Sequence, residues 1–253
     1  MVVGIESFKN WFKGYENQYA IIGGTACDIL MSQEGRHFRA TKDIDLVLII
    51  EALNPDFGSK LWEYIKLGNY EHRNKSSGNP QFYRFINPQS PNFPKMIELF
   101  SRKTDYIKLP EDAVLTPLHI DENVSSLSAI LLDDAYYNFL RSGTTIVNDI
   151  TVLGPGYLIP FKMKAWLDLS NRKQKNENNI DSKNIKKHKN DVFRLADILT
   201  PNLKIGVSKE IYTDIELFIK KMEKEDVDLK QLDVVGRNKE DILTALKQMY
   251  FIN

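Results

Sequence analysis

The sequence predicts an α+β fold, in which a mixed β-sheet with flanking helices is followed by a C-terminal helical domain. In the first part of the chain, short apolar and β-branched runs alternate with helical patterns. Beyond Gly154-Pro-Gly156, apolar residues recur at helical spacing only. A chain of 253 residues can form one large domain or two modest ones. We therefore place a boundary at residue 154, which gives domains of residues 1–154 and 155–253.

The elements follow from local patterns in chain order. Residues 44–50 form a nearly continuous apolar run, which is typical of a buried strand. Residues 87–94 are rich in Pro, Asn and Ser and are expected to join two strands. The expected strands are residues 19–23, 44–50, 81–86, 95–100, 116–120, 126–132 and 144–153. The expected helices are residues 7–14, 25–31, 59–67, 157–172, 182–199, 209–224 and 239–251, the last three with Ser182, Ser208 and Asn238 as N-caps.

Composition narrows the classes of protein. Lys and Arg together balance Asp and Glu at 34 each, so the chain has no overall field that would attract nucleic acid. Basic residues are concentrated only in residues 171–190, which are either a solvated segment or a local nucleic-acid surface. The single cysteine, Cys27, rules out an intramolecular disulfide. The chain has no signal-peptide pattern and no long apolar run, so we expect a cytoplasmic protein without a membrane segment.

Asp43 and Asp45 stand at the start of the strand expected over residues 44–50. Residues two apart in a strand project from the same face, so the two carboxylates are expected side by side. Like charges at this distance repel unless a cation or a proton compensates them, and Mg²⁺ or Mn²⁺ is the usual ion for such oxygen ligands. The alternative is a pair of acids that are solvated or paired with Arg39 or Lys42, and the residues alone leave it open.

Gly23 and Gly24 lie between an expected strand and an expected helix. Glycine at this position lets backbone amides approach a phosphate, and the start of the helix adds free N–H groups and a favourable dipole. Thr25 can contribute a hydroxyl donor. Glycine pairs are also common in ordinary turns, so the pair taken alone does not decide between a phosphate site and a turn.

Taken together, these residues resemble the signature of the nucleotidyltransferase fold of polymerase β-like enzymes. The resemblance consists of Gly23-Gly24-Thr25, a helix, a basic connection that includes Arg39 and Lys42, and Asp43-Ile-Asp45. It implies a third carboxylate on a later strand, and Glu98, a lone acid in the apolar run 95–100, matches. It therefore implies a metal site of Asp43, Asp45 and Glu98. The alternative for Glu98 is a solvent-facing position on a half-exposed strand.

Residues 161–172 and 181–195 resemble the helical half of abortive-infection (AbiEii)-type nucleotidyltransferases, several of which are toxins of toxin–antitoxin pairs. That group pairs a lysine on one helix with an aspartate on the next. Lys164 and Asp191 match this pair, while His188 stands where an aspartate is more usual. The resemblance covers about residues 19–199 and implies that the helical domain completes the catalytic cleft.

The implied activity is metal-dependent transfer of a nucleoside monophosphate from an NTP to an acceptor hydroxyl, with release of pyrophosphate. The resemblance leaves the acceptor open between a tRNA and a protein, and a toxin would have an antitoxin protein as partner. The alternatives are a nucleotide-sugar-dependent glycosyltransferase, which also uses Asp-x-Asp, and a non-catalytic nucleotide-binding protein. The implied catalytic residues are Asp43, Asp45, Glu98, Lys164 and Asp191, and the implied nucleotide-binding residues are Gly23, Gly24, Thr25, Arg39, Lys42 and His188.

Overall fold

A computed structural model describes residues 2–49, 51–71, 81–101, 130–131, 133–175 and 180–253. The chain divides into two compact units. The first unit comprises Met1–Leu132 and Thr144–Leu153, and the second comprises Asp133–Gly143 and Gly154–Asn253. The last division falls next to the predicted boundary at residue 154, whereas the segment Asp133–Gly143 groups with the second unit.

The first unit is built on a six-stranded mixed sheet in the order β3-β4-β2-β1-β6-β5. The central strand β2 pairs antiparallel with β1 and parallel with β4, and β1 pairs parallel with β6. The two outer pairs, β3–β4 and β5–β6, are antiparallel. The strands are β1 (Tyr19–Ile22), β2 (Asp43–Leu48), β3 (Gln81–Ile86), β4 (Met96–Ser101), β5 (Thr144–Val147) and β6 (Ile150–Leu153).

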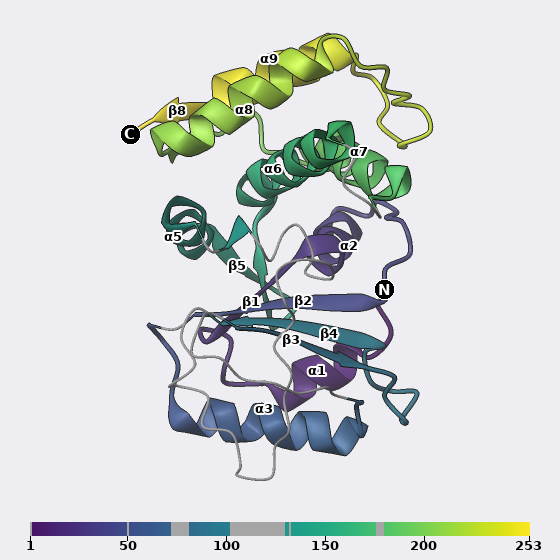
Figure 1. Cartoon of the computed structure of the whole chain (residues 1–253), viewed down its shortest axis with the longest axis vertical. Helices are drawn as coiled ribbons and strands as arrows, with labels where there is room; N and C mark the ends of the chain where they lie inside the picture. Colours follow the sequence, from purple (N-terminus) through teal and green to yellow (C-terminus); the bar gives the residue numbers. More distant parts are fainter. Residues whose placement is uncertain (1, 50, 72–80, 102–129, 132, 176–179) are drawn as a thin grey trace. The chain divides into compact units, whose positions relative to one another are not determined.

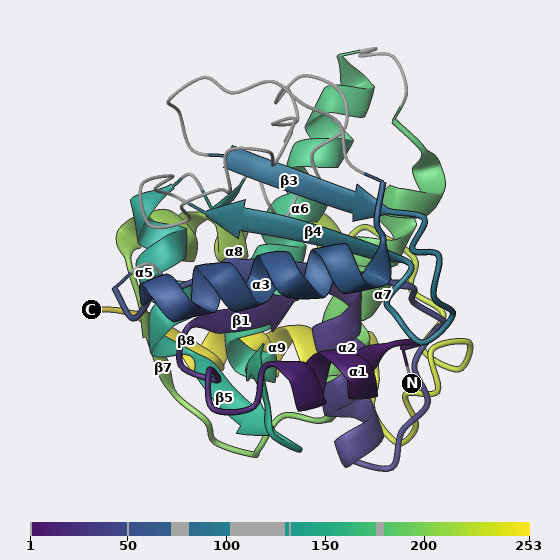
Figure 2. The same cartoon turned by 90° about the horizontal axis from the view of Figure 1, so that it is seen from below.

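Helices cover both faces of this sheet. The helices α1 (Ile5–Trp11) and α3 (Pro55–Gly68) lie on one side of it and α2 (Gly23–Gln33) on the other (Figure 1), and α1 and α3 lie in front of the strands when the unit is seen from below (Figure 2). Aromatic rings fill the layer under α1 and α3, with centroids 4.6 Å apart for Phe8 and Phe12 and 5.3 Å apart for Phe12 and Tyr64. The face of the sheet under α1 and α3 is therefore part of an aromatic core.

The second unit is mainly helical. The helices α6 and α7 pack against each other most extensively, and α6 also packs against α5 and α8. A short parallel pair of strands, β7 (Ile205–Val207) and β8 (Tyr250–Ile252), completes it. The helices are α5 (Asp134–Ser142), α6 (Pro155–Gln174), α7 (Ser182–Asp197), α8 (Lys209–Met222) and α9 (Lys239–Met249). None of the described helices of the chain combines the length and the apolar character needed to span a membrane.

The predicted α+β architecture, a mixed sheet with flanking helices followed by helices, is confirmed, with three corrections. The prediction of helices alone after residue 154 is wrong, because β7 and β8 are strands of three residues, too short to show a period in sequence. The strand expected over 144–153 is a hairpin, whose turn residues Asn148 and Asp149 both have positive φ. The helix α5 was not predicted, although Asp133 caps it by accepting from Ala135 N at 2.8 Å.

Two predicted N-caps are confirmed, since Ser208 Oγ accepts from Ile211 N at 3.3 Å and Asn238 Oδ1 accepts from Asp241 N at 2.8 Å. At α7 the cap is Asp181 rather than Ser182, one residue earlier than expected. The expected strand 116–120 and most of the expected strand 126–132 lie outside the described residues.

Candidate active site

The first unit carries Asp43 and Asp45 at the beginning of β2. Both are half-buried, whereas Ile44 and Leu46 between and after them are buried, with exposed fractions of 0% and 1%. This alternation puts the two carboxylates on one face of the sheet and the apolar side chains on the other. The face with the carboxylates is the one that α2 covers.

The neighbouring strands extend this face with two further charges. Asp45 lies opposite Glu98 in the parallel pair β2–β4, and Glu98 lies opposite Arg84 in the antiparallel pair β3–β4. Glu98 is buried, and its Oε1 accepts a hydrogen bond from Arg84 Nε at 2.8 Å. The Nη2 group of Arg84 donates to the same oxygen. Arg84, Glu98 and Asp45 therefore form a row across three adjacent strands.

Sequence reasoning missed Arg84. The available signal was a lone cation in the apolar run of residues 81–86, which matches the lone acid Glu98 in the run of residues 95–100. Only the register of the hairpin places these two residues opposite each other, and a shift of one residue would have put Arg84 on the other face.

The backbone of Gly23 lies against the Asp45 side chain. Gly23 has φ +70°, and a Cβ added to it would lie 2.7 Å from Cγ of Asp45. Gly23 begins α2, which has no side-chain N-cap and no acidic residue in its first turn. The N–H groups of a helix start and the helix dipole favour negative charge there, whether it comes from Asp45 or from a phosphate.

The next residues tie the same turn to the connection before β2. A Cβ on Gly24 would lie 2.8 Å from Thr41 Oγ1 and 3.4 Å from Nη2 of Arg39. Thr25 is fully buried, and its hydroxyl donates to the carbonyl of Asp43 at 2.5 Å. The structure thus gathers the turn, Arg39 and the aspartate pair at one end of β1 and β2. Lys42, next to the pair, is exposed.

The donor set of this face fits a hard divalent cation only in part. Asp43 and Asp45 offer carboxylate oxygens on one face, as Mg²⁺ requires when it shares its coordination with substrate phosphates and waters. Glu98, in contrast, has one oxygen engaged by Arg84. Within the part of the chain that the structure describes, no three Asp, Glu, His or Cys side chains converge as a metal-binding group. The two aspartates therefore fit a metal better than the three carboxylates do.

In the second unit, the lysine of α6 that contacts Asp191 is Lys162. Its Nζ lies 2.9 Å from Asp191 Oδ2, and both side chains are fully buried. Arg194 Nη1 lies 3.6 Å from the other oxygen of Asp191. The expectation that Lys164 is paired with Asp191 is therefore corrected, because residues two apart on a helix point to different faces.

Lys164 belongs to another cluster, with residues of α5, α6 and α8. Its Nζ lies 3.1 Å from Asp214 Oδ2, which also accepts from Tyr136 Oη at 3.0 Å. Burial lowers the pKa of Lys164, but the negative charges of Asp168 and Asp214 outweigh it, so the pKa is raised above the usual value. Burial likewise raises the pKa of Asp168 and of Tyr136. His188, on α7, is 7% exposed.

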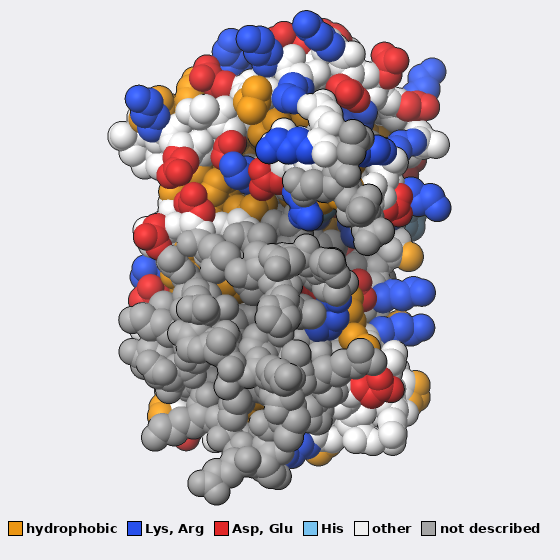
Figure 3. Space-filling view, viewed as in Figure 1, with side chains coloured by type: hydrophobic (Ala, Val, Ile, Leu, Met, Phe, Trp, Pro, Cys, Tyr) orange, Lys and Arg blue, Asp and Glu red, His pale blue; other side chains and the backbone are white. Residues whose placement is uncertain are grey.

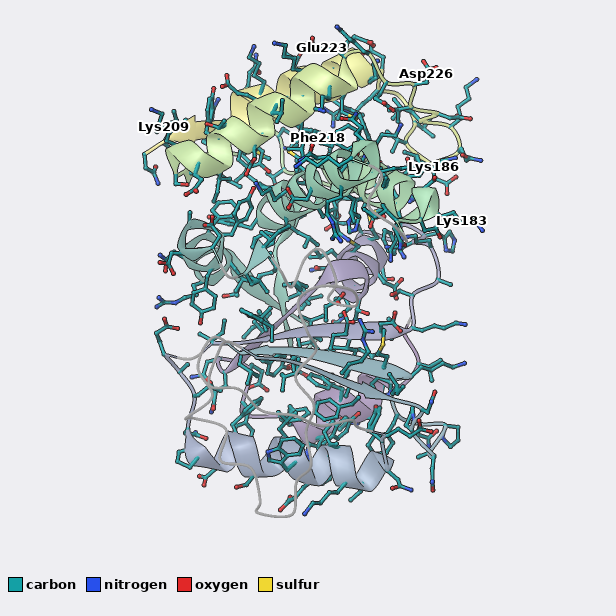
Figure 4. The ribbon with its side chains drawn as sticks, viewed as in Figure 1. Lys183, Lys186, Lys209, Phe218, Glu223 and Asp226 are labelled. Atoms are coloured by element: carbon teal, nitrogen blue, oxygen red, sulfur yellow. The ribbon has the colours of Figure 1, made fainter. Side chains whose placement is uncertain are left out.

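The basic segment 171–190 has exposed cations at the end of α6 and the start of α7. Lys183 and Lys186 extend from the first turns of α7 (Figure 4), and Lys189 instead binds Glu225 Oε2 at 2.8 Å. On the face of the second unit that Figure 3 shows, basic and acidic side chains are interspersed. The exposed cations of the segment are Arg172, Lys173, Lys175, Lys183 and Lys186.

Comparisons with known proteins give little beyond the fold. No family model matches the chain, and no curated protein matches it. Among solved structures, the solution structure of the antibiotic-resistance factor ANT(2'')-Ia is similar, with 10% sequence identity and a TM-score of 0.35. The similarity covers 73% of this chain and 78% of that chain. At this level it carries no argument about activity or site residues.

Proposed function

We propose that this protein is a metal-dependent nucleotidyltransferase, which transfers a nucleoside monophosphate from an NTP to an acceptor hydroxyl and releases pyrophosphate. One observation carries the proposal: the Asp45 carboxylate lies against Gly23 at the uncapped start of α2, on the same face as Asp43. A pair of hard oxygen ligands thus adjoins the backbone N–H groups of a helix start, which suit a phosphate.

In this proposal each residue of the first unit has a defined task. Asp43 and Asp45 would hold Mg²⁺ or Mn²⁺, and the ion would supply charge neutralisation and polarisation of the phosphate oxygens. Gly23 and Gly24 let the phosphates approach the backbone, with the guanidinium of Arg39 close to Gly24. Thr25 fixes the start of β2 through its hydrogen bond to the Asp43 carbonyl.

The proton of the acceptor hydroxyl passes to a carboxylate of the same face, Asp45 or Glu98. Lys42 is exposed next to the pair and suits a triphosphate as a point charge. We also propose that Lys164 and Asp191 take part in catalysis and that His188 takes part in nucleotide binding.

The proposed acceptor is a macromolecule, either a tRNA or a protein. The exposed cations of residues 171–190 suit the phosphate backbone of a tRNA. A toxin role, with an antitoxin protein as partner, rests on the resemblance of the helical segments alone. A search of the neighbouring genes for a small antitoxin tests it independently of the chemistry.

The test of the metal site is calorimetry of NTP binding in the presence and absence of Mn²⁺. We expect Asp43→Asn and Asp45→Asn each to weaken metal-dependent binding at least about tenfold, since each removes one anionic ligand. Asp56→Asn, which changes an exposed aspartate of α3, is the matched control and should bind as the wild type does. Unchanged metal-dependent binding in a folded Asp43→Asn/Asp45→Asn variant would overturn the proposal.

The test of the reaction is incubation with each NTP labelled at the α-phosphate, together with metal and a cell extract. Nucleotidyl transfer places the label on the acceptor and releases pyrophosphate. Transfer from a nucleotide sugar would instead release a nucleoside diphosphate, which separates the glycosyltransferase alternative. A non-catalytic binding protein would produce neither product.

A further inference from the structure

The pairing of Arg84 with Glu98 bears on the number of metal ions that the proposed site holds. Asp43, Asp45 and Glu98 bring three negative charges to one face, and Arg84 offsets one of them. A guanidinium keeps its charge under all ordinary conditions and forms its strongest hydrogen bonds with a carboxylate. The pairing with Arg84 therefore makes Glu98 a poorer metal ligand than a carboxylate without such a partner would be.

The geometry places Arg84 where a second cation would act. Two of its donor groups, Nε and Nη2, donate to a single oxygen of Glu98, and the side chains of Arg84 and Glu98 are 26% and 10% exposed. A second divalent ion shared between Glu98 and Asp45 would have to displace this pair or lie next to a fixed positive charge. Two-metal sites hold their ions roughly 4 Å apart, so such repulsion would be strong.

We propose that Arg84 is a positioning residue that takes the place of a second metal ion: it holds Glu98 away from the metal, so that the nucleotide-free protein binds one divalent ion at Asp43 and Asp45. This inference rests on the proposed function, and it fixes the metal stoichiometry of that site. Arg84 then acts through Glu98, whose carboxylate it holds by two hydrogen bonds.

The experiment is titration of Mn²⁺ into the nucleotide-free protein, followed by calorimetry and by the paramagnetic resonance signal of free Mn²⁺. We expect one ion per wild-type chain. Arg84→Met leaves the buried Glu98 uncompensated and should admit a second ion, with an affinity at least about tenfold above any second-site binding of the wild type. Arg84→Lys keeps the charge and should bind one ion.

Two variants control for indirect effects. Arg84→Met/Glu98→Gln removes the carboxylate as well as the cation and should return the stoichiometry to one ion. Lys9→Met removes the cation of a different ion pair in the same unit, 2.8 Å from Glu6, and should leave binding unchanged.

Wild-type binding of two ions, or one ion in a folded Arg84→Met, would overturn the inference while leaving the proposed function standing. If Arg84→Met does not fold, Arg84→Met/Glu98→Gln decides, because it removes both charges of the pair. The inference requires it to bind one Mn²⁺ with wild-type affinity, and a loss of tenfold or more would make Glu98 a ligand and overturn it. Absence of any Mn²⁺ binding in the wild type overturns the proposed function itself.

Discussion

Among single residues, Gly23 limits the geometry of the site most strongly. Its φ of +70° disfavours any side chain, and an added Cβ would meet the Asp45 carboxylate. The same glycine therefore permits two features at once: the tight entry into α2 and the approach of Asp45 to the helix start. Gly24 has a milder restriction, because the nearest atom to its added Cβ belongs to the Thr41 side chain.

We predict that Gly23→Ala weakens metal-dependent nucleotide binding and lowers the free energy of unfolding by at least about 1 kcal/mol, because the backbone is strained and Asp45 must move. Gly14→Ala is the matched control: Gly14 has φ +88°, but nothing lies within 4 Å of its added Cβ. Urea unfolding and Mn²⁺ calorimetry of both variants measure the two effects. Metal binding in Gly23→Ala as tight as in Gly14→Ala would show that the contact with Asp45 has no role.

The sequence predicts some of these residues better than others. The common face of Asp43 and Asp45 follows from the two-residue period of a strand, and the exposure pattern of β2 agrees with it. The place of Glu98 opposite Asp45 was implied by resemblance and appears in the register of β2 and β4. Arg84 was missed because strand register depends on long-range pairing, which a single sequence does not encode locally.

On the scale of elements, α6 carries two lysines with different surroundings. Lys162 is fully buried and bonds to Asp191 of α7, whereas the side chain of Lys164 is 30% exposed and bonds to Asp214 of α8. Lysine is rarely buried, so nothing in the local pattern favours Lys162 over Lys164 for the interior. The helix was predictable from its apolar period, but the partner of each lysine depends on how α7 and α8 pack on it.

We predict that Lys162→Met lowers the free energy of unfolding by about 3–5 kcal/mol, since it leaves the buried Asp191 without its lysine. Lys164→Met should cost less than Lys162→Met, because the Lys164 side chain is 30% exposed and its pair is partly in contact with solvent. Urea unfolding measures both. Lys162→Met/Asp191→Leu is the control, which should recover most of the loss because it removes both charges. Equal effects of the two single variants would contradict the assignment of Lys162 as the buried partner.

Across the whole molecule, the same physical reasons explain which elements sequence analysis could find. Long periodic helices and the apolar strands β2 and β4 were expected within a few residues of their observed bounds. The strands β7 and β8 have three residues each, and the pattern of α9 continues into β8, so only their pairing with each other distinguishes them. The grouping of α5 with the second unit likewise arises from packing against α6 and α8.

Buried tyrosines in both units give the protein a predictable response to alkaline pH. Burial raises the pKa of each above its usual value near 10, and in Tyr136 the charge of Asp214 adds to the effect. The five tyrosines are Tyr19, Tyr64, Tyr70, Tyr136 and Tyr250.

Below about pH 10 a tyrosine is neutral in both the folded and the unfolded state and adds no pH dependence. Above it, the unfolded state loses the proton while the folded state keeps it, so stability must fall. We predict a loss of about 1.4 kcal/mol per pH unit for each such tyrosine, measured by urea unfolding between about pH 8 and pH 11.5. The raised pKa of Lys164 lowers stability above about pH 10.5 in the same direction.

The control variant is Tyr136→Phe. It should reduce the loss of stability per pH unit by the share of one tyrosine, although it also loses the bond to Asp214 and starts from a lower stability. Stability that stays constant up to about pH 11.5 would show that these hydroxyls are not held neutral by burial.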